Sequence, residues 1–152
     1  AGETVGLVGE SGSGKSVTAM SVLRLLPAAK TRYGERSRVI LRGRDVLAAP
    51  EAELRALRGA EVSMVFQEPM TALNPVVRIG DQLVEVLRRH ARLDAAAARE
   101  RALALLADMK IADPARAFGS FPHELSGGMR QRAMIAMAFS CDPALIVADE
   151  AT

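Results

Sequence analysis

A glycine-rich turn at residues 9–16 constrains the fold of this chain more than any other feature of its sequence. The turn follows a short apolar, β-rich run at residues 4–8 and precedes a helical stretch at residues 15–26, which Pro27 ends. A strand, a tight turn and a helix in this order begin a parallel α/β unit. The sequence therefore predicts an α/β fold whose first strand-to-helix connection is this turn.

The turn also carries a recognisable chemistry. It has the form G-x-x-x-x-G-K-S, which binds phosphate when it joins a strand to a helix. Because glycine has no Cβ, the backbone can approach a phosphate closely. Its N–H groups and the helix start can then converge on the phosphate oxygens. Lys15 adds a charge for the β- and γ-phosphates, and Ser16 offers Mg²⁺ a hydroxyl. The predicted nucleotide-binding residues are Gly9, Ser11, Gly12, Ser13, Gly14, Lys15, Ser16 and Val17.

A second apolar run, at residues 144–148, ends in two carboxylates, Asp149 and Glu150. Open α/β sheets bind their ligands at the carboxyl edge of the strands. Asp149 is therefore a candidate Mg²⁺ ligand, and Glu150 is a candidate base for the water that attacks the γ-phosphate. An Asp-Glu pair alone more often marks a turn or a helix start, but the phosphate loop favours the functional interpretation.

Hydrophobic spacing and turn residues predict the remaining elements. They are a hairpin at residues 39–45, a helix at 51–58, a buried strand at 62–66, and helices at 79–93, 94–109 and from Gly128 to about Ser140. Asp94 is predicted to cap the second of these long helices. The predicted organisation is a phosphate-loop α/β core with the hairpin at 1–70, a helical subdomain at 71–140 and a return strand of the core at 141–152.

A third motif, Leu125-Ser126-Gly127-Gly128, opens the last predicted helix. A serine cap followed by two glycines makes a second anion site at a helix start. One nucleotide rarely needs two distant helix starts of the same chain. The tetrapeptide alone would be more simply explained as an ordinary capped helix, but its order and spacing relative to the other motifs favour a functional role.

Together these motifs resemble the ATP-binding cassette (ABC) family of ATPases. The resemblance implies a phosphate-loop NTPase (RecA-like) core with a mostly parallel sheet and an inserted α-helical subdomain. It implies that Leu125, Ser126, Gly127 and Gly128 contact the ATP held by the phosphate loop of a second subunit. It also implies that Gln67 is the Q-loop glutamine. The catalytic residues would then be Glu150, Gln67 and Lys15, and the Mg²⁺ ligands Ser16, Gln67 and Asp149.

Longer stretches, at residues 66–75, 79–82 and 121–132, are similar to signatures of the peptide- and nickel-importing branch of that family. The resemblance implies a subunit that binds and hydrolyses ATP with Mg²⁺ to energise import of di- or oligopeptides or a related small solute such as nickel. Its implied partners are a second ABC ATPase subunit, membrane permeases and, indirectly, a solute-binding protein. The net charge of +2 gives no argument for nucleic acid.

The expected location is peripheral, on the cytoplasmic face of the membrane. No apolar stretch approaches the roughly 20 residues needed to span a bilayer, and the single Cys141 fits a reducing compartment. The family's adenine-stacking residue, D-loop and switch histidine fall outside residues 1–152, so we expect a truncated domain that is inactive in isolation. Ala151 stands where the family usually has proline.

Three other interpretations stay open at this point. A soluble ABC ATPase acting on DNA or ribosomes typically carries a long coiled-coil insert, whereas the helical block here is compact. A phosphate-loop kinase or other NTPase would lack the Leu-Ser-Gly-Gly motif. A non-hydrolysing fragment is the third interpretation.

Overall fold

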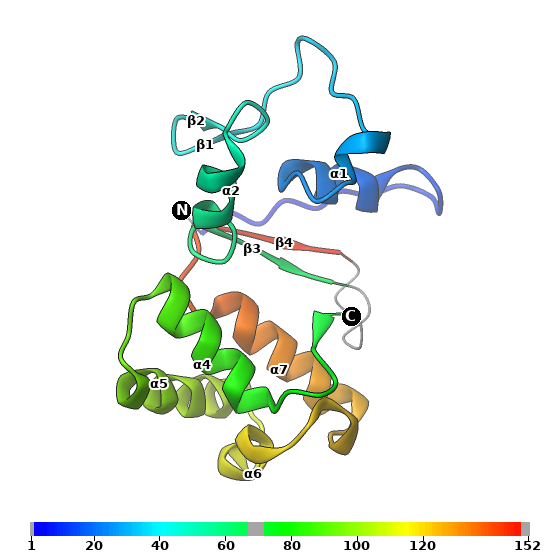
Figure 1. Ribbon diagram of the computed structural model, residues 1–152. Helices are drawn as coiled ribbons and strands as arrows, with labels where there is room; N and C mark the ends of the chain where they lie inside the picture. The colour runs from blue at the N-terminus through cyan, green and yellow to red at the C-terminus, as the bar shows by residue number, and fades with distance from the viewer. Residues whose placement is uncertain (1, 67–71, 150–152) are drawn as a thin grey trace. The chain divides into compact units, whose positions relative to one another are not determined.

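Residues 2–66 and 72–149 are described by the computed structural model of the protein, whose helices and strands are shown in Figure 1. Gln67 and Glu150, both predicted to be catalytic, lie outside the described residues, as does Ala151. The chain divides into two compact units, one ending at Arg58 and the other beginning at Gly59. Each unit is described separately below.

The first unit consists of short elements joined by turns. They are α1 (Lys15–Val22), the 3₁₀ helix η1 (Ala28–Lys30), the antiparallel pair β1 (Ile40–Leu41) and β2 (Arg44–Asp45), and α2 (Glu51–Leu57). Its small core contains Val46, Ala49 and Leu54, against which Val39 and Leu41 pack. The predicted hairpin and short helix are thus confirmed.

The helix that follows the glycine-rich turn is shorter than predicted, and side-chain hydrogen bonds from Arg58 hold its C-terminal end. It stops at Val22, and Arg24 takes a left-handed backbone conformation with φ of 50°. No residue of α1 is buried. Instead, the guanidinium of Arg58 donates to the carbonyls of Leu23 (2.9 Å) and Arg24 (2.8 Å) at the end of this helix. The same guanidinium pairs with Glu51 at 3.1 Å.

The strand predicted at residues 4–8 is not formed. These residues have neither helical nor strand structure, and the side chains of Val5, Leu7 and Val8 are 81%, 61% and 94% exposed. A strand exists only through hydrogen bonds to a neighbouring strand. Among the strands that the structure describes, none pairs with this segment.

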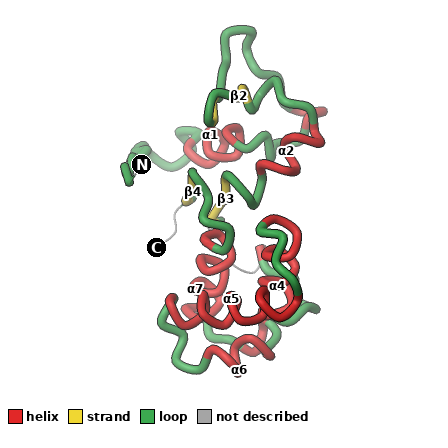
Figure 2. The backbone as a smooth tube through the Cα atoms, turned by 90° about the vertical axis from the view of Figure 1, so that its left-hand side faces the viewer, coloured by secondary structure: helices red, strands yellow, loops and turns green. Residues whose placement is uncertain are grey.

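The second unit contains most of the hydrophobic core. Its elements are β3 (Val62–Val65), α4 (Ile79–His90), α5 (Ala95–Asp108), α6 (Pro114–Gly119), the 3₁₀ helix η2 (Pro122–Glu124), α7 (Gly127–Phe139) and β4 (Leu145–Ala148). Ile79, Leu83, Leu87 and Leu106 are almost completely buried where the helices meet. Figures 1 and 2 show these helices clustered together, with β3 and β4 at one end of the cluster.

The helix boundaries in this unit have clear local causes. The carboxylate of Asp94 accepts a hydrogen bond from the Ala97 N–H at 2.9 Å, which confirms the predicted cap of α5. Helix α6 was not predicted; Asp113 caps it and Pro114 occupies its first turn. Gly80 of α4 allows the Phe118 ring of α6 to pack closely, because a Cβ at Gly80 would lie 2.3 Å from that ring.

Strands β3 and β4 run parallel, with Val62 opposite Leu145 and Val65 opposite Ala148. Their inner side chains pack on the last part of α7, where Val65 meets Met134 and Ala138. Strand β4 is less buried than its apolar sequence predicts, since Leu145 is 38% exposed. The reason is that β4 has one strand neighbour, β3, in the part of the chain that the structure describes.

Candidate functional site

The phosphate loop adopts a tight turn that depends on glycine. Gly12 and Gly14 have φ values of 80° and 94°, in the left-handed region that other residues rarely occupy. Within the loop, the Ser13 N–H donates to the carbonyl of Glu10 at 3.2 Å. The Thr18 N–H donates to the Gly14 carbonyl at 2.8 Å, which begins α1 directly after the loop. The turn therefore delivers the start of a helix.

Lys15 closes over this loop. Its ammonium donates to the carbonyls of Gly9 (2.8 Å) and Glu10 (2.9 Å). At the start of the loop, the backbone of Gly9 lies close to the Ser13 side chain, because a Cβ on Gly9 would come 2.6 Å from the Ser13 hydroxyl oxygen. The positive charge is thus held beside the backbone of the turn, where a phosphate bound by the loop would meet it.

The start of α1 suits an anion in a further way. Gly14 is the N-cap residue, and no side chain caps the helix. The first N–H groups of any helix have no partner within the helix, and they carry partial positive charge. Ser16 lies in this first turn, and the neighbouring loop residues Ser11 and Ser13 are exposed. These residues fit a nucleotide phosphate group.

At the end of β4, Asp149 lies beside β3. Its N–H donates to the Val65 carbonyl at 3.0 Å, which extends the parallel ladder one step past Ala148. Along the sequence, Gln67 follows Val65 by two positions and Glu150 follows Ala148 by two. The register therefore brings the chain segments that lead into both residues to the same edge of the strand pair.

The predicted signature opens α7 as a capped helix. The Ser126 hydroxyl oxygen accepts from the Met129 N–H at 3.3 Å, and Leu125, only 6% exposed, anchors the approach in the core. A Cβ at Gly127 or Gly128 would meet no protein atom within 4 Å, and neither residue has a positive φ. Neither packing nor backbone conformation in this chain therefore requires glycine at these two positions.

The signature lies at the start of α7. The acidic edge, which is the end of the strand pair at Val65 and Asp149, lies farther along that helix. Met134 and Ala138, which pack on Val65, follow Ser126 by 8 and 12 residues. At a rise of 1.5 Å per residue, this separation is about 12–18 Å along the helix axis. Within the second unit, α7 thus holds the two features apart instead of joining them in one site.

The whole chain, residues 1–152, matches the family described as ABC transporter. The chain belongs to the ABC transporter family.

The relatives of this ABC chain include transport proteins for dipeptides. It is 57% identical over 151 residues to the probable D,D-dipeptide transport ATP-binding protein DdpD of Escherichia coli (strain K12), covering 99% of this chain and 46% of that protein. It is 46% identical over 151 residues to the dipeptide transport ATP-binding protein DppD of Bacillus subtilis (strain 168), covering 99% and 45%. The chain thus spans about half the length of these curated relatives.

Solved ABC structures confirm the predicted fold class. The ATP-binding cassette MJ0796, described as a dimer in a post-hydrolysis state bound to ADP and Pi, superposes with a TM-score of 0.78 at 27% identity. The match covers 94% of this chain and 58% of that one. The phosphate-loop NTPase fold and the membership of the ABC family, both predicted from the motifs, are therefore confirmed.

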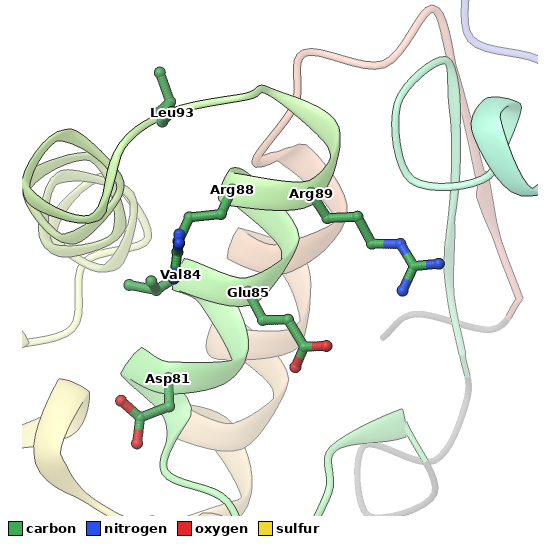
Figure 3. Close-up of a pocket in the computed structure, with 6 residues that line it drawn as sticks. All are labelled: Asp81, Val84, Glu85, Arg88, Arg89 and Leu93. Carbon is green, nitrogen blue, oxygen red and sulfur yellow. The ribbon is translucent and has the colours of Figure 1, made fainter.

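None of the predicted site residues lines the surface pocket of about 490 Å³ in the second unit of this ABC chain. It is lined by Asp81, Val84, Glu85, Arg88, Arg89 and Leu93, on and just after α4 (Figure 3). Across residues 2–66 and 72–149, no three His, Cys, Asp or Glu side chains gather as a metal site. Of the predicted Mg²⁺ ligands, Ser16 and Asp149 lie among the described residues, and Asp149 is a carboxylate.

No helix in the described part of the chain has both the length and the apolar character needed to cross a membrane.

Two polar residues with clear structural roles were not predicted. Arg58 fixes the end of α1, and Gln82 is a buried amide on α4 with only 9% of its surface exposed. Gln82 was detectable in part, because it lies three residues after Ile79 and so shares the buried face of the predicted helix. No pattern marked Arg58, whose partners are backbone carbonyls 34 and 35 residues earlier.

Proposed function

We propose that the protein containing this chain is the subunit of an ABC importer that binds and hydrolyses ATP to drive uptake of di- or oligopeptides. The observation that carries the proposal of hydrolysis is the register of β3 on β4. It supports one shared edge for Gln67, Asp149 and Glu150, the three residues proposed to act around the γ-phosphate. The names of the relatives DdpD and DppD support dipeptides or related peptides as the transported class.

ATP binding is assigned to the phosphate loop. The N–H groups of the loop and of the uncapped start of α1 would hold the β- and γ-phosphates, and the Lys15 ammonium would neutralise their charge. Ser16, Gln67 and Asp149 would hold Mg²⁺, which supplies positive charge to the phosphates during phosphoryl transfer. Gly9, Ser11, Gly12, Ser13, Gly14 and Val17 complete the proposed nucleotide site.

Hydrolysis is assigned to the edge of the strand pair. The Glu150 carboxylate would accept a proton from the attacking water, and the Gln67 amide would orient that water. Lys15 would stabilise the charge on the transferred phosphoryl group.

The signature is proposed to act on the nucleotide of a second ABC subunit, identical or paralogous. Gly127 and Gly128 support this role, because they have no side chains and so leave the start of α7 open to close approach by a bulky anion. The separation of Ser126 from the acidic edge along α7 supports it as well. The relative MJ0796 is described as a dimer, which agrees with such an arrangement for that protein.

The remaining partners follow from the proposed role. Permease subunits in the membrane would receive the conformational change, and a solute-binding protein would deliver the peptide. The subunit would lie peripherally on the cytoplasmic face. In this scheme residues 1–70 form the phosphate-loop core with the hairpin, residues 71–140 the helical subdomain and residues 141–152 the return strand.

The test uses the full-length protein, alone and in vesicles with its permeases. Wild-type protein should hydrolyse Mg-ATP and drive peptide uptake. Glu150→Gln should bind ATP normally and lose hydrolysis by a factor of about 100 or more, because a general base contributes on the order of 10²–10⁴. Glu85→Gln, the same change on the exposed face of α4, is the matched control. Normal turnover by Glu150→Gln would remove that residue from catalysis, and peptide-independent ATPase activity without uptake would contradict peptide import.

A further inference from the structure

One buried amide, that of Gln82, fixes Asn74–Val77, the described segment that comes after Gln67 in the sequence. Its side-chain oxygen accepts from the Asn74 N–H at 3.0 Å. Its side-chain nitrogen donates to the carbonyls of Asn74 (3.0 Å) and Val77 (2.8 Å). The orientation of the amide is defined by these partners, because a flipped amide would direct its oxygen at two carbonyls.

The hydrogen bonds of Gln82 offset the free-energy cost of burying its amide. It lies between Ile79 and Leu83, both fully buried on the apolar face of α4. A buried amide destabilises a protein unless its hydrogen bonds are made. Both donors of Gln82 and one acceptor position are satisfied by a single short segment, so the amide and that segment fix each other.

The segment is also held by hydrogen bonds within itself. The Asn74 side chain accepts from the Val76 N–H at 3.1 Å, and the Val77 N–H donates to the Asn74 carbonyl at 3.3 Å. Leu73, just before it, is only 2% exposed and belongs to the core of the helical cluster. The chain is therefore anchored to α4 from Leu73 onward.

The same first turn of α4 also holds the approach to the signature. The Ile79 N–H donates to the Ser120 carbonyl at 2.9 Å, and the Arg78 guanidinium lies 5.4 Å from the centre of the Phe121 ring. From Phe121, the 3₁₀ helix η2 leads into Leu125, and the Glu124 carboxylate secures it by accepting from the Phe121 N–H at 2.7 Å. One turn of α4 thus contacts two segments more than 40 residues apart, Asn74–Val77 and Ser120–Phe121.

We propose that Gln82 is a positioning residue that joins the segment after Gln67 to the turn of α4 that seats the signature, so that the two move as one body. Displacement of the chain at Asn74 would then displace Ser126 without any contact between the two residues. The inference rests on the proposed function, from which Gln67 and Ser126 take their roles. It adds the side chain that connects them.

Two substitutions separate positioning from simple stability. Gln82→Leu keeps the size and removes all three hydrogen bonds. Gln82→Glu keeps the shape but directs a carboxylate oxygen at the carbonyls of Asn74 and Val77. Burial and these carbonyls would raise the pKa of the introduced carboxyl. Once protonated, that carboxyl can donate again, so its defect should be relieved as the pH falls.

The experiment measures three quantities in the full-length protein: amide hydrogen exchange at Asn74, affinity for ATP, and kcat for ATP hydrolysis. We expect Gln82→Leu to raise exchange at Asn74 and at residues 120–126, to leave ATP affinity within about twofold, and to lower kcat about tenfold. We expect Gln82→Glu to match it at pH 8 and to recover at least half of the lost kcat at pH 6. Glu85→Gln is the control and should behave as wild type throughout.

Unchanged kcat in both variants, with wild-type protein active, would overturn the role of Gln82. So would a loss of kcat in Gln82→Glu that does not respond to pH, or a rise in exchange confined to Asn74. An inactive wild-type protein would instead refute the proposed function, and unchanged exchange at residues 120–126 would then refute the connection separately.

Discussion

The two helix starts proposed to grip ATP, those of α1 and α7, are built in opposite ways. The α1 start depends on the backbone: Gly14 has φ of 94°, no side chain caps the helix, and none of its residues is buried. The α7 start depends on packing: Ser126 caps it in an ordinary extended conformation. The helix then buries Ala133, Met134, Ala136 and Ala138.

The difference fits the two roles we propose. A loop that wraps its own ligand gains from backbone N–H groups and from a lysine whose ammonium is already held beside them. A helix start that must meet a ligand carried by another subunit gains from a rigid body behind it, because its position is fixed before the ligand arrives. Mutations should therefore act differently at the two ends.

The largest effect should come from damaging each helix start separately. Lys15→Ala should weaken ATP binding about 100-fold, since an ammonium paired with phosphate is worth several kcal/mol. Ser126→Arg should leave ATP affinity of the monomer unchanged but lower turnover about 100-fold, because its bulk would block closure of the dimer. Nucleotide titration and steady-state hydrolysis in the full-length protein measure both.

Lys30→Ala and Ser126→Ala are the controls for these two changes. Lys30 is an exposed lysine of the same unit as Lys15. Ser126→Ala removes the cap without adding bulk and should cost only about 1 kcal/mol of stability. The comparison of the two helix starts would fail if Ser126→Arg weakened ATP binding as much as Lys15→Ala does.

A smaller effect should appear when a glycine is replaced by alanine at each of the two helix starts. Gly14→Ala forces alanine into a left-handed conformation and should lower the melting temperature by about 2–4 °C. Gly128→Ala meets no neighbour and favours helix, so it should raise the melting temperature slightly while still lowering ATPase activity. Calorimetry of the two full-length variants gives the shifts, and equal destabilisation by both would show that the two starts are built alike.

The smallest predicted effect is a loss of folding stability as the pH falls, and it should be confined to the unit that contains α7. The His90 ring packs over Gly59, where a Cβ would lie 3.0 Å from its Nε2 atom. Burial, with a smaller contribution from Arg89, lowers the pKa of His90 below its ordinary value of 6.5. The folded state then binds fewer protons than the unfolded state, so stability is complete above pH 6.5 and declines as the pH falls toward the lowered pKa.

Hydrogen exchange between pH 7.5 and 5.5, corrected for intrinsic rates, should detect this loosening in α4 and around Gly59. The variant His90→Gln should lack the pH dependence. A response of equal size in α1 would contradict its assignment to His90.

The sequence predicted those parts of the fold that are determined locally. The cap of α5 at Asp94 and the hairpin near Gly43 each depend on a few neighbouring residues, and both are found. Helix α6 was missed because its six residues are too short to show a helical repeat, although Asp113 and Pro114 mark its start. The strand predicted at residues 4–8 failed because its apolar pattern contains no information about a pairing partner.

The same limit applies to the site. The phosphate loop and the signature are contiguous in sequence, so their residue types and spacing identified them. The pairing of β3 with β4, and the bonds from Gln82 to Asn74, join residues that no local pattern connects. Such contacts depend on how whole elements pack, which spacing alone does not determine.

The parallel register of β3 and β4 has a consequence for how this domain can change over evolutionary time. Loops within the intervening helical block can gain or lose residues, because such changes leave the ladder from Val62 to Val65 intact. A single inserted residue within either strand would instead turn every following side chain to the opposite face. We therefore expect natural length variation to spare these eight paired positions and to gather in the loops between the helices.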